Sequence, residues 1–250
     1  MVTRSLQKLA QELGNPQPPQ ASVIPPSPAS REEESVLVFA RGKEIYRVGE
    51  WEPELLATRP LGVNALCVHA NRLYDAGAYN EIYETLKDRV IAERPAETWA
   101  LCVHGGELYD AGELGTIYST LSNQRLGLRP LGDGIGALCS HEGKLYAAAK
   151  LGIYELETQV LTARRWRVYA ILSHNGNLYD AGSTGVYNTL EGSAVCSMDR
   201  FRGLCSYKGE LVSISPKGII RLSLSEKGIS LLGQGEGASV VVSVPASALG

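Results

Sequence analysis

The sequence predicts an all-β fold in which one short unit repeats and the units close into a ring. A motif returns at a period of about 35 residues, glycine-containing turns fall at a fixed place in each unit, and the chain ends complement each other. The motif is clearest at residues 65–77, where Ala-Leu-Cys-Val-His is followed, after a short turn, by Leu-Tyr-Asp-Ala-Gly. It begins again at residues 100, 137, 170 and 203.

Each unit is expected to form four short strands, which in the first complete unit are 65–69, 73–77, 82–86 and 90–93. These segments are rich in Val, Ile, Leu, Tyr and Thr, which favour strands. Glycine recurs at the second position of the first turn because two-residue hairpins need positive φ. Four strands cannot enclose a core alone, so the units must stack on one another. The turn pairs are Gly105-Gly106, Glu142-Gly143, Asn175-Gly176 and Lys208-Gly209.

The two chain ends favour a closed ring over a linear solenoid. The first unit lacks an inner strand, because its segments at 36–39, 44–48 and 54–57 match only the later three strands of the other units. One orphan strand, 239–244, remains at the other end. Pairing it with the first unit removes two exposed edges. The ring then has six units, which begin at about residues 36, 65, 100, 137, 170 and 203, with 239–244 completing the first.

Over residues 35–244 this pattern resembles the β-propeller superfamily. A strand, a glycine turn, a Leu-Tyr or Ile-Tyr strand and a glycine before the next strand are similar to the short repeats of sensor-type and tryptophan-aspartate propellers, although the Trp-Asp dipeptide is absent and the blades are shorter. The resemblance implies a six-bladed propeller of four-stranded antiparallel blades. It implies little about function, since propellers host binding, scaffolding and catalysis.

Residues 1–34 are expected to lie outside the ring, which occupies 35–250. Apolar residues recur at helical spacing up to Gly14 and predict a short amphipathic helix, which docks on its own domain or on a partner or membrane surface. Six prolines between residues 16 and 30 then predict a stiff spacer. The apolar residues of the helix are Val2, Leu6, Leu9, Ala10 and Leu13.

Composition excludes several classes of protein. A net charge of -3 with 20% charged residues provides no basic field for nucleic acid. No apolar run approaches the ~18 residues of a membrane span, and no secretory leader is evident. Four of the five cysteines share one repeat position, which disfavours disulfides and indicates small buried hydrophobes: Cys67, Cys102, Cys139 and Cys205. We expect a cytoplasmic monomer.

All four histidines end the inner strands, so ring closure places them on one rim. A ring of imidazoles could bind a ligand or a metal, or supply a catalytic acid or base. No acidic residue recurs beside them to orient the rings, and Tyr207 takes the same position in the last unit, which favours a packing role. We therefore expect no metal and no cofactor, and keep as a possible ligand ring His69, His104, His141 and His174.

Three aspartates, Asp75, Asp110 and Asp180, share a position near the end of the second strand. Side-chain alternation places each on the same face as a leucine two residues earlier, so each is expected to be partly buried and to accept hydrogen bonds. The expected donors are the following turn or the backbone of a neighbouring blade.

A basic and aromatic group gathers at the loops between blades, on the face opposite the histidines. Trp, Tyr and Arg dominate interaction hot spots, and Arg favours carboxylate and phosphate. The alternative is that the arginines pair with acidic neighbours such as Glu93 and Asp199. The candidate binding residues are Arg94, Trp99, Arg129, Arg164, Arg165, Trp166, Tyr169 and Arg202.

These observations predict a binding or scaffold propeller that takes a protein or a small anionic ligand on the face with the inter-blade loops. The alternative is a propeller enzyme, a lyase or hydrolase with a channel-side histidine as acid or base. No nucleophile motif, phosphate loop or paired-cysteine metal spacing occurs. Because residues that recur in every unit serve the unit, function is expected where the repeat is interrupted.

Overall fold

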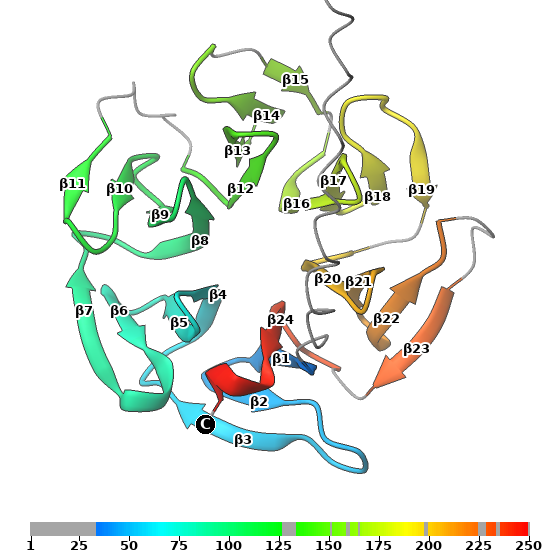
Figure 1. The fold of residues 1–250 in the computed structure, drawn as a ribbon. Coiled ribbons are helices and arrows are strands. Elements are labelled where there is room, and N and C mark those ends of the chain that lie inside the picture. Colours follow the sequence, from blue (N-terminus) through cyan, green and yellow to red (C-terminus); the bar gives the residue numbers. More distant parts are fainter. Residues whose placement is uncertain are drawn as a thin grey trace, which may run out of the picture. The chain divides into compact units, whose positions relative to one another are not determined.

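A computed structural model describes residues 34–126, 134–150, 152–158, 161–164, 166–197, 200–224, 229–233 and 236–249. In this part of the chain, six four-stranded antiparallel sheets stand around a central axis as blades 1 to 6 (Figure 1). The predicted fold class and number of blades are therefore confirmed. The predicted N-terminal helix and proline-rich spacer lie outside the described residues.

Every blade has the same order of strands from the axis outwards. The inner strands of blades 1 to 6 are β24 (Val240–Pro245), β4 (Val63–His69), β8 (Thr98–His104), β12 (Ala137–His141), β16 (Val168–His174) and β20 (Leu204–Tyr207). The second strands are β1 (Ser35–Arg41), β5 (Arg72–Gly77), β9 (Glu107–Gly112), β13 (Lys144–Ala149), β17 (Asn177–Gly182) and β21 (Glu210–Ser215). The third strands are β2 (Glu44–Arg47), β6 (Glu81–Glu84), β10 (Ile117–Ser119), β14 (Gly152–Glu155), β18 (Gly185–Asn188) and β22 (Gly218–Leu222). The outer strands are β3 (Glu54–Thr58), β7 (Arg89–Glu93), β11 (Gln124–Arg125), β15 (Leu161–Ala163), β19 (Ala194–Cys196) and β23 (Ile229–Gly233).

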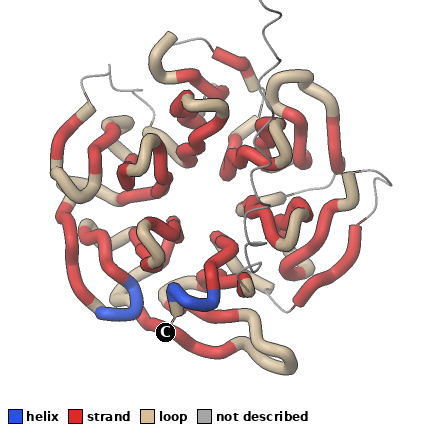
Figure 2. Tube along the Cα trace, in the orientation of Figure 1, coloured by secondary structure: helices blue, strands red, loops and turns tan. Residues whose placement is uncertain are grey.

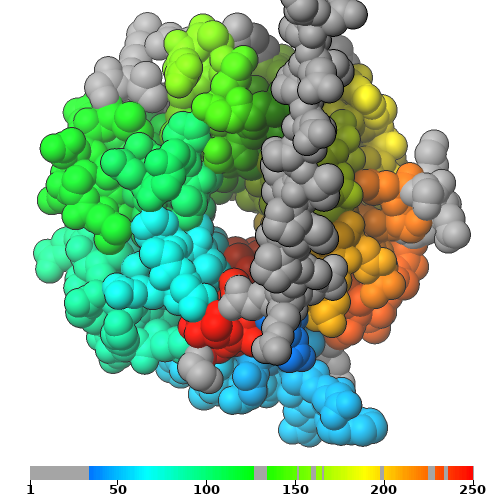
Figure 3. Space-filling view, in the orientation of Figure 1, coloured from blue at the N-terminus to red at the C-terminus, as the bar shows by residue number. Residues whose placement is uncertain are grey.

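The C-terminal strand closes the ring. β24 pairs antiparallel with β1, with Val244 opposite Val36 and Val240 opposite Ala40. It thereby takes the inner place of blade 1, as the complementary chain ends predict. In the space-filling view the closed ring leaves an opening at its centre (Figure 3).

The turns between the inner and second strands have the predicted hairpin conformation. In blades 2 to 6 two consecutive residues have positive φ, for example Gly105 at 57° and Gly106 at 82°. The turn of blade 2 has the same conformation without glycine, with φ values of 46° at Ala70 and 57° at Asn71. Two positive φ values match the right-handed twist of the flanking strands.

The hydrophobic core lies between the blades. Six clusters of buried side chains are present, and each draws its residues from two adjacent blades. One of them joins Val38 and Ile45 of blade 1 to Leu66 and Leu73 of blade 2. No blade can therefore bury its faces without both neighbours.

Helix is scarce in the described residues, as the colouring of Figure 2 shows. Two short 3-10 turns are present, η1 (Thr85–Lys87) and η2 (Ala246–Ala248). No helix in the described ranges is long and apolar enough to cross a membrane.

Replacing Val244 by Asp tests the closure of the ring. Val244 is 0% exposed in the closing strand, so a carboxylate there would be buried without a partner and should lower the free energy of unfolding by about 3 kcal/mol or more. The control Leu231→Asp lies in an outer strand at 64% exposure and should cost under about 0.5 kcal/mol. Equal costs in urea denaturation would contradict closure by β24.

Candidate binding site at the mouth of the central channel

Three inner strands contain a β-bulge at their first residues. The pairing register shifts between Val63 and Ala65 in blade 2, and shifts at the equivalent points of blades 3 and 5. The residues inside these shifts are Asn64, Trp99 and Tyr169. A bulge redirects a side chain and is common beside binding sites.

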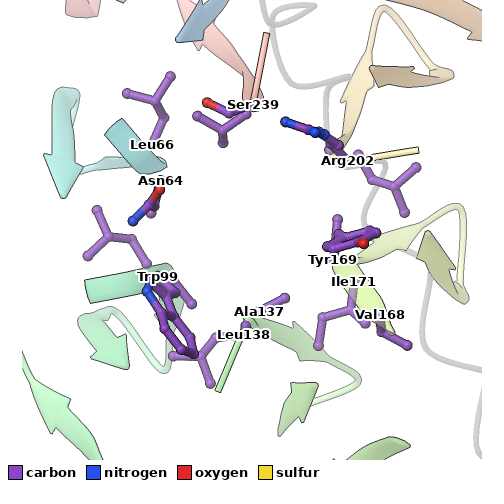
Figure 4. Close-up of a pocket in the computed structure, with 18 of the residues that line it drawn as sticks. Asn64, Leu66, Trp99, Ala137, Leu138, Val168, Tyr169, Ile171, Arg202 and Ser239 are labelled. Atoms are coloured by element: carbon purple, nitrogen blue, oxygen red, sulfur yellow. The ribbon is translucent and has the colours of Figure 1, made fainter. Parts of the chain in front are cut away.

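The same position in all six blades surrounds the mouth of the central channel, and we call these residues the collar. Although the neighbouring positions repeat from blade to blade, the collar position holds a different residue in each (Figure 4). Together these residues line a cavity of about 520 Å³ at the end of the ring that carries the inter-blade connections. The collar consists of Asn64, Trp99, Gly136, Tyr169, Arg202 and Ser239.

The floor of this cavity is apolar. Two residues beyond the collar, each inner strand contributes one aliphatic side chain, and all six are at most 8% exposed. The cavity therefore combines a polar and aromatic rim with an aliphatic base. The floor residues are Leu66, Leu101, Leu138, Ile171, Leu204 and Val241.

Two arginines make the rim positive. Arg202 and Arg167 are both exposed and line the cavity, and neither forms an ion pair with any other described residue. The guanidinium of Arg167 lies 5.5 Å from the ring centroid of Tyr169. Among the described residues that line the cavity, one is acidic: Glu97, which accepts a hydrogen bond of 3.0 Å from Nε1 of Trp99. The site can therefore offer two cations beside two aromatic rings.

A second cavity, of about 600 Å³, adjoins the first over blade 4. Both are lined by Trp99, Gly136, Arg167 and Val168. Trp166 forms one wall of the second cavity, and its ring is stacked on Tyr187 at 4.6 Å between centroids. We call this second cavity the blade-4 groove.

The recurring arginines and aspartates meet across the blade interfaces. Arg94 follows β7 of blade 2, and its Nε and Nη2 each donate to a carboxylate oxygen of Asp110 in blade 3 at 2.6 Å. Arg59 makes the same two-bond contact with Asp75 at 2.7 and 2.8 Å, and Arg164 with Asp180 at 3.1 and 2.5 Å. All six side chains are at most 7% exposed.

Further contacts complete these Arg–Asp clamps. Thr120 donates to Asp110 at 2.8 Å, and the guanidinium of Arg94 lies 4.5 Å from the ring centroid of Tyr118. Burial alone would lower the pKa of Arg59, but the hydrogen bonds and charge of Asp75 outweigh burial, so that pKa is raised. The three clamps thus pair six buried charges across the blade interfaces.

The structure separates the residues that the sequence predicts for the site into different places. The aspartates are buried acceptors as expected, but their donors are guanidinium and hydroxyl groups of side chains rather than a turn or the backbone. Arg94 and Arg164 lie in the clamps, whereas Trp99, Tyr169 and Arg202 lie in the collar and Trp166 in the blade-4 groove. Arg129 and Arg165 lie outside the described residues. Three collar residues are not among those predicted from the sequence: Asn64, Gly136 and Ser239. The change of residue at one fixed position of the repeat is a signal that could have found them.

The histidines lie at the other end of the inner strands, and three of them bond to the next blade. In each of these three histidines, Nδ1 contacts the Oγ atom of a serine in the next blade. The distances are 2.9 Å for His104–Ser140, 2.9 Å for His141–Ser173 and 3.0 Å for His174–Ser206. For His69, the equivalent position of the next blade holds Val103 in place of a serine. No group of three or more His, Cys, Asp or Glu among the described residues is placed to hold a metal ion. Ligand binding or acid–base catalysis by this rim stays a prediction.

The cysteines lie free within the ring. Burial raises the pKa of the thiols of Cys67, Cys139 and Cys205 to about 12. Such thiols stay protonated at neutral pH and react poorly. They behave as the small packed hydrophobes that their shared repeat position predicts.

Comparison with known proteins supports the architecture. No family model matches the sequence, and no curated protein sequence matches it. A chain in the crystal structure of a nidogen/laminin complex is similar in structure, with a TM-score of 0.70 and 12% identity over 84% of this chain and 98% of that chain. This chain is a six-bladed β-propeller.

Two further solved structures share the propeller fold. The WD40 β-propeller domain of Doa1 has a TM-score of 0.59 and 12% identity, over 80% of each chain. The extracellular domain of the putative hybrid two-component system BT4673 from B. thetaiotaomicron has a TM-score of 0.58 and 11% identity, over 81% of this chain and 32% of that one. At such identities the likeness shows the fold alone.

Replacing Asp110 by Ala tests the Arg–Asp clamps of the propeller. The guanidinium of Arg94 would stay buried without its counter-charge, which should cost about 3–5 kcal/mol of folding free energy. The matched control is Glu54→Ala, which removes the exposed partner of Arg47, where the side chains are 54% and 40% exposed, and should cost under about 1 kcal/mol. Similar unfolding midpoints for the two variants would contradict a structural role for the clamps.

The histidine rim should make the stability of the propeller depend on pH. Burial lowers the pKa of His174 below its unfolded value of about 6.5, so the unfolded chain binds the proton more readily. The free energy of unfolding should therefore fall as the pH drops through about 6.5 towards the folded pKa. His174→Gln should reduce this fall in denaturant titrations between about pH 7.5 and 5, and an unchanged pH profile would contradict the assignment.

Proposed function

We propose that this propeller is a binding module that holds an anionic, ring-bearing group of its partner in the collar cavity. The observation that carries the proposal is the presence of Arg167 and Arg202, without acidic partners among the described residues, beside Trp99 and Tyr169. The chain as a whole carries a net charge of -3, so this concentration of cations is local.

The chemistry of the rim favours such a group. Guanidinium groups bind carboxylate or phosphate through two parallel hydrogen bonds, and aromatic side chains stack on flat rings. The aliphatic floor removes water from the apolar part of the ligand. The cavity volume of about 520 Å³ lies within the range of roughly 300–1,000 Å³ that is typical of ligand pockets.

The scaffold supports the proposal because it holds the collar rigidly. Asn64, Trp99 and Tyr169 are the second residues of their inner strands, and the other three collar residues lie one or two residues before theirs. The inner strands pack directly on their neighbours around the ring. Sites built on strands are held more firmly than sites on loops. The similar nidogen/laminin structure is itself that of a complex, which agrees with a propeller that binds a protein partner.

Reversing the two rim charges tests the proposal with phenyl phosphate as the probe. Arg167→Glu with Arg202→Glu should weaken binding at least about tenfold, because charge-assisted hydrogen bonds are replaced by repulsion. The control Lys208→Glu makes a charge reversal in the turn at the histidine end and should leave binding within about twofold.

Calorimetric titration of the full chain measures these affinities, and thermal unfolding checks that the variants fold. Equal affinity of the double variant and the wild type for phenyl phosphate would contradict the proposal, as would no binding by the wild type at millimolar concentrations.

A further inference from the structure

The collar is open on one side. Five of its residues carry side chains, but blade 4 contributes Gly136. The collar cavity and the blade-4 groove have Gly136 in common, together with residues on either side of it. Figure 4 shows the labelled collar residues of the other blades around the mouth, with Ala137 and Leu138 marking blade 4. The mouth therefore continues outwards through a gap over this blade.

The blade-4 groove is suited to an aromatic side chain. Its base in β13 consists of Ala148 and Ala149, which leave room above them, and Trp99 and Trp166 both line it. The ring of Trp99 is fixed by its bond to Glu97 and by close contact with Gly134, where an added Cβ would lie 2.6 Å from the ring. A fixed ring beside a small-residue base favours insertion of a second ring.

One of the two cations lies at the junction of the two cavities, and the other lies in the mouth. Arg167 lines both, and Arg202 lines the collar. A ligand that occupies both spaces would therefore carry negative charge at the mouth and an aromatic group in the groove. A small anion would fill the mouth alone and leave the groove unused.

We propose that the partner presents an extended acidic peptide segment with one aromatic residue, and that this segment leaves the mouth through the gap at Gly136. This inference rests on the proposed function and specifies its ligand. Carboxylates of the segment pair with Arg167 and Arg202, and its aromatic ring lies between Trp99 and Trp166. The two cavities together supply the length that an extended chain needs.

Gly136 allows the gap to be filled without disturbing the fold. A Cβ added there would lie 3.6 Å from the carbonyl oxygen of Val168 and 3.9 Å from that of Ala148, which are ordinary contact distances. Its backbone is also outside the positive-φ region that disfavours side chains. Gly136→Leu should therefore block the gap in a folded protein, and Gly136→Ala is the matched control.

The experiment compares two probes on the full-length chain. The first is the unlabelled peptide Asp-Asp-Phe-Asp-Asp and the second is phenyl phosphate, and calorimetric titration measures the affinity of each. Gly136→Leu should weaken binding of the peptide at least about tenfold, because the groove that it blocks holds the contacts of the peptide's ring. Its affinity for phenyl phosphate should stay within about twofold of that of the wild type. Gly136→Ala should leave both within about twofold, because a methyl group does not close the gap.

The outcomes separate the two proposals. If Gly136→Leu binds the peptide as the wild type does, the exit through the gap is overturned and the anion site stands. If it loses both probes equally, the side chain blocks the mouth itself, and the exit is again overturned. If the wild type binds neither probe, the proposed function fails and this inference fails with it.

A double-mutant cycle between the peptide's Phe and Trp99 tests the aromatic contact independently of Gly136. Replacing the peptide's Phe by Ala should weaken binding to the wild type at least about fivefold, and should have less than about a twofold effect on Trp99→Ala. Equal losses for the two proteins would show that the peptide's ring does not contact Trp99 and would overturn its placement in the groove.

Discussion

Every apolar face of a blade in this protein is covered by another blade, and the rest of the structure depends on this constraint. Each of the six buried clusters draws on two neighbours, so one missing strand exposes two interfaces. Blade 1 lacks an inner strand until β24 returns from the end of the chain. The closing strand therefore completes the core as well as the sheet.

The closed ring separates residues that hold the blades together from residues that can bind. The Arg–Asp clamps and the His–Ser bonds recur at equivalent positions and between them join the blades in sequence from blade 1 to blade 6. Collar residues share one backbone position but differ in chemistry from blade to blade. A ring of equivalent positions thus provides a mouth whose chemistry can be varied one residue at a time, while the interfaces below it stay the same.

Periodicity and turn chemistry are local properties, so the sequence suffices to predict the ring, its closure and its hairpins. The partners across the blade interfaces depend on how separate sheets stack. Arg94 and the collar residue Arg202 are both arginines in a connection between an outer strand and the next inner strand. The guanidinium of Arg94 nevertheless lies buried against Asp110. In blades 2, 3 and 5 the collar residue lies in a bulge, which the sequence marks only on the partner strand, by the glycine that ends the second strand opposite the register shift. Trp99, Tyr169 and Arg202 could be found as residues that interrupt the repeat, but Gly136 matters through the side chain it lacks.

A paired alanine scan tests most directly whether the repeated positions build the ring and the collar binds. One set replaces the collar residues Asn64, Tyr169 and Arg202, and the other the buried second-strand leucines Leu73, Leu108 and Leu178, which are at most 1% exposed. Collar variants should lose phenyl phosphate binding and change the free energy of unfolding by under about 0.5 kcal/mol. Leucine variants should lose about 2–5 kcal/mol. Collar variants that destabilise the ring as much as the leucine variants, or that bind phenyl phosphate as the wild type does, would contradict this division of roles.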